Sequence, residues 1–265
     1  MGAYKGLLKI GIKNEFQYRV SAISGCLTQI FWGFMLISLY TAFMQEKAVE
    51  GFSISQMATY IWLGQAFFAM KYIMLPKDAG REIVSGNVCY KIIRPVNLYD
   101  QWFVQLTSEK FVATGLRFLP ILILGAVLPA NIGLALPVSF PAFLMFLFTL
   151  IIGFFMAIAI SMIAVALTFR TMTERGVSTM VNVVTSIFCG TLIPLPLMPI
   201  GFQKVVNYLP FRAIGDLSFR IYIGNIGITE ALIQCAIALG WLALIIVIGK
   251  VALKRSTKKI VVQGG

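Results

Sequence analysis

The 265-residue sequence contains no histidine. This absence excludes Ser-His catalysis, histidine-ligated zinc or haem, and histidine proton relays. No Cys-x-x-Cys pair occurs among the four cysteines, so neither a disulfide framework nor a metal cluster is indicated. These cysteines are Cys26, Cys89, Cys189 and Cys235. We therefore predict no catalytic residue and no metal site in this chain.

Charged residues are also scarce, at 12% of the chain against about 25% in an ordinary soluble domain. Hydrophobic residues make up 59%, and the mean hydropathy is +0.88. A membrane-crossing helix needs roughly 20 apolar residues, so the length leaves room for about six crossings and no separate soluble domain. The expected fold is an all-α membrane protein with one transmembrane domain over residues 1–265.

Apolar stretches long enough to cross a lipid bilayer occur six times. They cover about 20–44, 55–76, 110–129, 139–168, 177–195 and 228–253. Residues 1–19 are too polar for a signal peptide, and on a helix every fourth side chain from Tyr4 to Phe16 is apolar, beside a row of lysines. This pattern predicts an interfacial helix on an anionic leaflet, and a solvated basic N-terminus is the alternative.

The formal net charge of +12 is unevenly distributed over the predicted loops. If the N-terminus is cytoplasmic, only four of the 22 basic residues lie outside, and four acids balance them. The outside basic residues are Lys47, Lys204, Arg212 and Arg220, and the outside acids are Glu46, Glu50, Asp216 and Glu230. The positive-inside rule then places both termini in the cytoplasm. The excess of basic residues on the cytoplasmic side accounts for the net charge, so no nucleic-acid partner is needed to explain it.

Two helical rows distinguish the fourth and fifth stretches. The fourth stretch has a row of small side chains at spacing four, formed by Gly153, Ala157, Ser161 and Val165. Such a row lets neighbouring helices approach closely. The fifth stretch instead carries a polar stripe in a largely apolar helix, formed by Ser178, Asn182, Thr185 and Cys189. Polar groups in hydrocarbon need partners, so the stripe faces either neighbouring protein, as interhelical contact, or a substrate path.

The inside connection over residues 76–101 predicts a short charged helix. Pro76 stands where a first helical residue would be and Gly86 where a C-terminal cap would be, which gives a helix from Lys77 to Ser85. We expect it to present Asp78, Arg81 and Glu82 outward. With the apolar element around residues 92–95, it fits a docking surface for a cytoplasmic partner, and a loop that folds only against its own helix ends is the alternative.

The outside connection over residues 189–225 is rich in proline. Pro194, Pro196 and Pro199 stop the preceding helix at the membrane edge. An amphipathic piece over 200–208 follows, and Pro210 then opens a second helix. In that helix three charged residues at spacing four let the acid pair in both directions; they are Arg212, Asp216 and Arg220. We predict a re-entrant helical hairpin in the outer leaflet that serves as a gate or mouth.

The chain carries no recognisable energy source. Apart from Glu230 near the outer end of the last stretch, no acidic residue lies inside a predicted span, so proton or sodium coupling is poorly supported. Long side chains at the inner end of a span can reach water. We expect this of Lys71 in the second stretch and of Glu109, Lys110 and Arg117 toward the inner end of the third. No G-x-x-x-x-G-K-[ST] motif occurs, so a partner chain must supply any energy for pumping.

Two strings carry a resemblance to a known family. REIVSGNVCYKIIRPVNLY at 81–99 and GTLIPLPLMPIGFQKVVNYLPF at 190–211 resemble patterns of type-2 ABC transporter permeases, in the branch with paired half-size permeases. The resemblance implies an exporter subunit of a bacterial or archaeal cell membrane. It would pair with itself or a sister permease and sit on two ABC ATPase subunits. Those ATPases would bind ATP and magnesium, and this chain would hold no cofactor.

The resemblance also implies roles for particular residues. The ATPase-coupling helix would contain Lys77, Asp78, Arg81, Glu82, Ser85 and Gly86. The translocation path or permease interface would contain Ser21, Ser24, Thr28, Ser178, Asn182, Thr185 and Cys189. The outer gate would contain Pro194, Pro196, Pro199, Phe202, Pro210 and Phe211.

The lightly hydroxylated, apolar path favours an amphipathic drug, a hydrophobic peptide or a lipid-like cargo. Polysaccharide is disfavoured, because Trp32 is the only tryptophan on the first and fifth spans. A stand-alone membrane immunity or binding protein is the alternative function. A membrane-embedded enzyme lacks a nucleophile–base pair or an acid pair at depth.

Overall fold

Four long apolar helices form the frame of the protein in the computed structural model, which describes residues 2–46, 52–93 and 95–258. They are α2 (Arg19–Glu46), α7 (Leu98–Val127), α8 (Phe140–Thr171) and α12 (Ile228–Thr257). Within the described residues, these four helices alone are long and apolar enough to cross a membrane. All regular structure there is helical, which confirms the all-α class. Lys47 and Glu50, and Arg94 within the predicted element around residues 92–95, lie outside the described residues.

Helix α8 is the central element of the bundle. In its most apolar stretch 67% is buried, against 22–28% in the other three long helices. Its small-residue row faces the interior, and Gly153 permits the closest approach. A Cβ atom added at Gly153 would lie 2.3 Å from the carbonyl oxygen of Ala213. The row is therefore a packing surface, as its spacing predicts.

The second and fifth apolar stretches are not continuous spanning helices. The second forms α3 (Ile54–Ala66) and the four-residue α4 (Phe68–Lys71), and the fifth forms α9 (Glu174–Phe188). At 1.5 Å per residue, α3 is about 20 Å long and α9 about 22 Å, shorter than the roughly 30 Å of a hydrocarbon core. The count of six crossings is therefore not confirmed by helix length.

The backbone that continues from α4 is extended and hydrogen-bonded to neighbouring helices. The amide of Ile73 donates to Asn182 Oδ1 on α9 over 3.1 Å. Lys110 on α7 donates to the carbonyl of Met70 over 3.2 Å and also to that of Tyr72. Lys110 is fully buried, so the expectation that it reaches water was wrong. It satisfies carbonyls that the end of α4 leaves without helical partners, which is the condition for irregular backbone at this depth.

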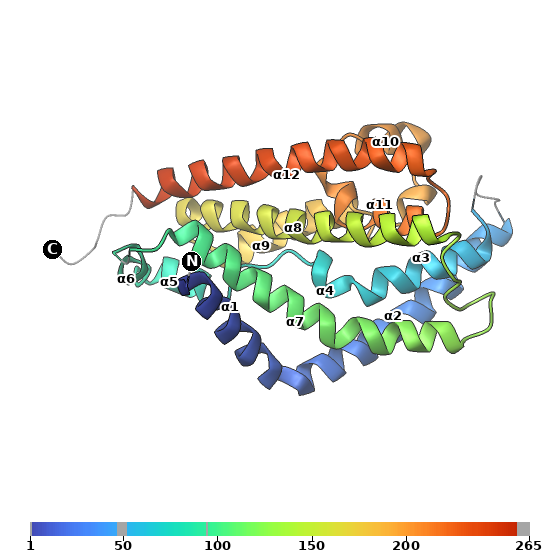
Figure 1. Cartoon of the computed structure of the whole chain (residues 1–265), viewed down its shortest axis with the longest axis horizontal. Helices are drawn as coiled ribbons and strands as arrows, with labels where there is room; N and C mark the ends of the chain where they lie inside the picture. Colours follow the sequence, from blue (N-terminus) through green and yellow to red (C-terminus); the bar gives the residue numbers. More distant parts are fainter. Residues whose placement is uncertain (1, 47–51, 94, 259–265) are drawn as a thin grey trace.

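The N-terminal segment forms α1 (Gly2–Glu15), followed by a short turn, η1 (Phe16–Tyr18), and meets α2 at an angle (Figure 1). Helix α1 packs on α7, where a Cβ at Gly11 would lie 2.2 Å from Ser108 Oγ. Glu15 forms an ion pair with Lys77. The helix is confirmed, and its position on a membrane surface stays a prediction.

Two short helices, α5 (Ala79–Val84) and α6 (Cys89–Ile92), lie at the same end of the bundle as α1 and the last turns of α12 (Figure 1). Helix α5 is shorter than the predicted 77–85. Asp78 has φ 64°, so the helix begins after it, and Pro76 is not its first residue. Gly86 has φ +77°, the left-handed conformation that a glycine cap provides.

The proline-rich connection folds into four short pieces at the opposite end. These are η2 (Leu195–Leu197), α10 (Ile200–Val206), η3 (Pro210–Ile214) and α11 (Asp216–Tyr222). The predicted second helix is thus interrupted at Gly215, and η3 and α11 are packed against α8 and α12. Its charged groups Arg212 and Asp216 are buried against protein, and the position of this piece in the outer leaflet stays a prediction. Only α10 retains an exposed apolar face, with Ile200 and Val205.

Candidate functional site

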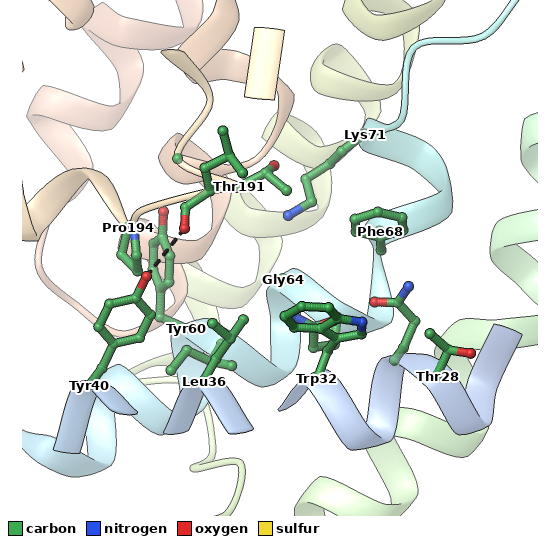
Figure 2. A pocket seen from close by; sticks show the side chains of 15 residues that line it. Thr28, Trp32, Leu36, Tyr40, Tyr60, Gly64, Phe68, Lys71, Thr191 and Pro194 are labelled. Atoms are coloured by element: carbon green, nitrogen blue, oxygen red, sulfur yellow. Dashed lines mark hydrogen bonds between the residues drawn. The ribbon is translucent and has the colours of Figure 1, made fainter. Parts of the chain in front are cut away.

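A cavity of about 450 Å³ lies between α2, α3, α4 and the loop that follows α9 (Figure 2). Pockets of about 300–1,000 Å³ are typical of small-molecule sites. Its walls are mostly apolar, with a few amide, hydroxyl and ammonium groups. The lining residues are Thr28, Gln29, Trp32, Leu36, Tyr40, Tyr60, Ile61, Gly64, Gln65, Phe68, Lys71, Gly190, Thr191, Leu192 and Pro194.

One face of α2 forms a side of this cavity. Thr28, Trp32 and Leu36 lie four residues apart and therefore share one face of the helix. Tyr40 continues that face, and its hydroxyl donates to the carbonyl of Leu192 over 3.2 Å (Figure 2). This hydrogen bond joins α2 to the outer loop and closes one end of the cavity.

Lys71 ends α4 and directs its ammonium group into the cavity (Figure 2). Its side chain is only 6% exposed. The ammonium nitrogen lies 5.4 Å from the centre of the Phe219 ring and 3.6 Å from where a Cβ at Gly64 would be. In the described part of the chain, no carboxylate lies within 4.0 Å of it.

Behind the cavity wall, α11 carries a buried charged cluster. The carboxylate of Asp216 is 0% exposed and accepts hydrogen bonds from Tyr60 Oη over 2.8 Å and from Arg212 Nε over 2.9 Å. Arg220 Nη1 lies 4.0 Å from the same carboxylate. Pairing in both directions is confirmed. The burial of Asp216 was not predicted. It makes the contacts with Tyr60 and Arg212 necessary, because a buried charge without partners is strongly destabilising.

The predicted path residues of α2 separate in the structure. Thr28 lines the cavity, whereas Ser24 is exposed and donates to the carbonyl of Val20 on its own helix. Ser21 lines a different hollow nearer the end that holds α1, together with Arg117. Only the middle of α2 therefore contributes to the cavity.

The polar stripe of α9 also divides. Asn182 accepts a hydrogen bond from the amide of Ile73, which joins α9 to the extended chain after α4, and Ser178 donates to the carbonyl of Glu174. Thr185 is buried, and its hydroxyl lacks a partner among the described residues. Cys189 is buried with its sulfur 3.0 Å from Thr191 Oγ1, and Thr191 lines the cavity. The stripe thus does not face one common channel.

The predicted outer-gate residues form the loop side of the cavity and the layer beyond it. Pro194 lines the cavity, Pro196 and Pro210 are buried, and Pro199 is exposed. An aromatic stack joins α9 to the outer pieces, with ring centroids 5.5–5.6 Å apart. In this stack Phe188 lies between Phe202 and Phe211. The sequence analysis missed Phe188.

The predicted coupling segment has one buried and one exposed face. Ala79, Gly80 and Ile83 pack into the core with α8 and α9. Arg81 is exposed over 84% of its side chain. Glu82 instead turns toward α6 and pairs with Lys91 over 2.7 Å, so the expectation that it points outward was wrong.

Apolar side chains extend the exposed face of α5 across α6. Ile93 is 80% exposed, and Val84 and Tyr90 are also exposed. The described part of the predicted docking element therefore presents apolar and basic groups together. Lys77, Asp78, Ser85 and Gly86 flank this face, and Lys77 is held by Glu15 of α1.

The polar cavity residues that were not predicted include Gln29, Gln65 and Lys71. Their signal was available, since each is a polar residue inside an apolar stretch. Lys71 was assigned to an inner end because the second stretch was read as one continuous helix. The break at Phe67 and the extended chain after Lys71 place it deeper in the protein.

Comparison with known proteins identifies the family. A family model described as "ABC-2 family transporter protein" matches residues 27–264. A search of curated proteins finds no match. The matched region contains the cavity, the segment around α5 and the outer pieces. The chain therefore belongs to the ABC-2 family of transporter permeases, the membrane components that associate with an ABC ATPase.

Proposed function

We propose that this chain is one permease of an ATP-driven exporter in a bacterial or archaeal cell membrane. It pairs with a second permease, identical or a sister chain. Two copies of an ABC ATPase bind ATP and magnesium and supply the energy. The chain crosses the lipid bilayer six times with both termini in the cytoplasm. The basic character of α1 and of the last turn of α12, which lie at one end of the bundle (Figure 1), supports this orientation.

The observation that carries the proposal is the two-faced segment around α5. Its exposed face, with Arg81 and Ile93, offers the apolar and basic groups that interface cores contain. Its buried face packs on α8 and α9, and a Cβ at Gly80 would lie 2.0 Å from Glu174 Cδ. Motion of a docked ATPase would therefore reach α8 and α9 directly, and α1 through the Lys77–Glu15 pair.

The translocation path runs through the cavity and along the neighbouring faces of α2 and α9. The second permease covers the exposed apolar face of α2, which includes Val20, Leu27 and Phe31. ATP binding closes the ATPases and shifts the permeases between arrangements. Such a shift moves cargo only if the arrangements bind it with different affinities. The outer pieces from Pro194 to Phe211 close the exit side.

Affinity purification from a membrane that contains the native partners tests the proposal. An ABC ATPase and a second permease are expected to copurify, and inactivating the ATPase should stop cargo export. If cells remain protected from a toxic cargo with no ATPase present, the stand-alone immunity or binding function is correct instead. The exporter proposal would be contradicted if no ATPase copurified with the chain and cells still exported the cargo after the ATPase was inactivated.

A further inference from the structure

Among the described residues that line the cavity, Lys71 alone is charged. Taking an ammonium group out of water is costly unless it gains a partner. The aromatic face of Phe219 supplies a weak one, and no carboxylate of the described residues lies within ion-pair distance. The cavity therefore holds a buried basic side chain that has no ion-pair partner among the described residues.

The surroundings increase this imbalance. Asp216 is the acid of the adjoining cluster, and it is already engaged by Tyr60 and Arg212, with Arg220 close by. Three basic side chains thus stand against one carboxylate around this part of the protein. Electrostatics favour an anion, and disfavour a second cation, next to Lys71.

We propose that the cavity binds the anionic group of an amphipathic cargo, a carboxylate, sulfonate or phosphate, at Lys71. This inference rests on the proposed function and narrows its cargo class. Gln29 and Gln65 add amide donors, and Thr191 adds a hydroxyl donor, for the anionic oxygens. The apolar part of the cargo contacts the walls formed by Trp32, Leu36, Ile61 and Phe68.

A structural role for Lys71 makes a different prediction. Its stem packs against Gly215, where an added Cβ would lie 2.9 Å from Lys71 Cδ, and its ammonium faces the Phe219 ring. If packing were its whole purpose, replacing it would alter stability without altering which charge a ligand may carry. Charge selectivity is therefore the decisive measurement.

The test uses the purified full chain, with any subunits that copurify, in phosphatidylcholine nanodiscs without ATP. Three probes share one tail: dansyl-undecanoic acid, its carboxamide, and its trimethylammonium analogue. After subtraction of empty nanodiscs, the acid should bind the wild type at least about tenfold more tightly than the carboxamide, with the cation weakest. Equal binding of acid and carboxamide, or tightest binding of the cation, would overturn the proposal.

Variants connect the selectivity to Lys71. Lys71→Gln should abolish the preference for the acid, and Lys71→Arg should retain it. Lys204→Gln, at an exposed lysine of α10, is the matched control and should behave as wild type. A Lys71→Gln protein that keeps the preference contradicts the assignment. If that variant does not fold, the three-probe comparison on the wild type decides by itself.

The two proposals fail independently. If the acid were not preferred but the ATPase copurified normally, only the proposal of an anionic cargo would be wrong. If the acid were preferred but no ATPase associated, the anion-binding site would be supported and the exporter proposal would be wrong.

Discussion

The hydroxyl of Tyr60 on α3 donates a 2.8 Å hydrogen bond to the carboxylate of Asp216 on α11. Tyr60 also lines the cavity, so one side chain forms part of its wall and anchors the outer pieces. The arrangement of α11 and the shape of the cavity are therefore linked through this contact.

This cluster should be sensitive to loss of its acid. Asp216→Asn leaves Arg212 buried without its counter-charge and should lower the free energy of unfolding by about 3–5 kcal/mol. Tyr60→Phe removes one hydrogen bond to the carboxylate and should cost about 1–3 kcal/mol. Asp100→Asn, which breaks the exposed pair with Lys250, is the control and should cost below about 1 kcal/mol. Denaturant unfolding in mixed micelles measures all three, and equal losses would contradict the ranking.

Gly153 and Gly240 form a matched pair of glycines in long helices. A Cβ at Gly153 would lie 2.3 Å from a backbone oxygen of η3, whereas one at Gly240 would meet nothing within 4 Å. Gly153→Ala should therefore destabilise by about 1–3 kcal/mol through overpacking, and Gly240→Ala should be neutral or stabilising by up to about 1 kcal/mol. Thermal unfolding in detergent checks this. A tolerated Gly153→Ala would show that η3 does not pack there.

The polar stripe of α9 can be divided by substitution. Asn182→Ala leaves the amide of Ile73 without its acceptor and should cost about 1–3 kcal/mol of stability. Ser178→Ala removes only a hydroxyl bonded to its own helix and should change stability by less than about 0.5 kcal/mol. Stability and export are measured for both. If Asn182→Ala abolishes export at unchanged stability, Asn182 acts in the translocation path and not as a structural contact to Ile73.

The exposed face around α5 should determine ATPase association. Arg81→Glu together with Ile93→Asp should reduce copurification of the ATPase at least about tenfold, because both side chains are exposed and neither supports the core. Lys204→Glu together with Val205→Asp places the same changes on α10 at the other end and should leave association intact. Membrane insertion should be normal in both. Normal association of the Arg81 and Ile93 variant would refute the coupling assignment.

Much of the local structure follows from residue spacing and chain chemistry alone. The long apolar runs of α2, α7, α8 and α12 predict spanning helices, since length and hydropathy suffice for that. The Gly153 row predicts close packing, and the Arg212–Asp216–Arg220 spacing predicts pairing in both directions. The strings around residues 81–99 and 190–211 predict the family, which the family match confirms.

Tertiary structure decided where these elements go and which polar groups meet. The end of the helix at Lys71 has no strong sequence signal, because it depends on Lys110 and Asn182 in distant segments satisfying the freed backbone. The burial of Asp216 depends in the same way on Tyr60, 156 residues earlier in the chain. Spacing determines which side chains share a helix face, but a cavity with Lys71 in it forms only when α2, α4 and the loop after α9 pack together. Long-range contacts of this kind are set by packing and polar satisfaction, which local patterns do not encode.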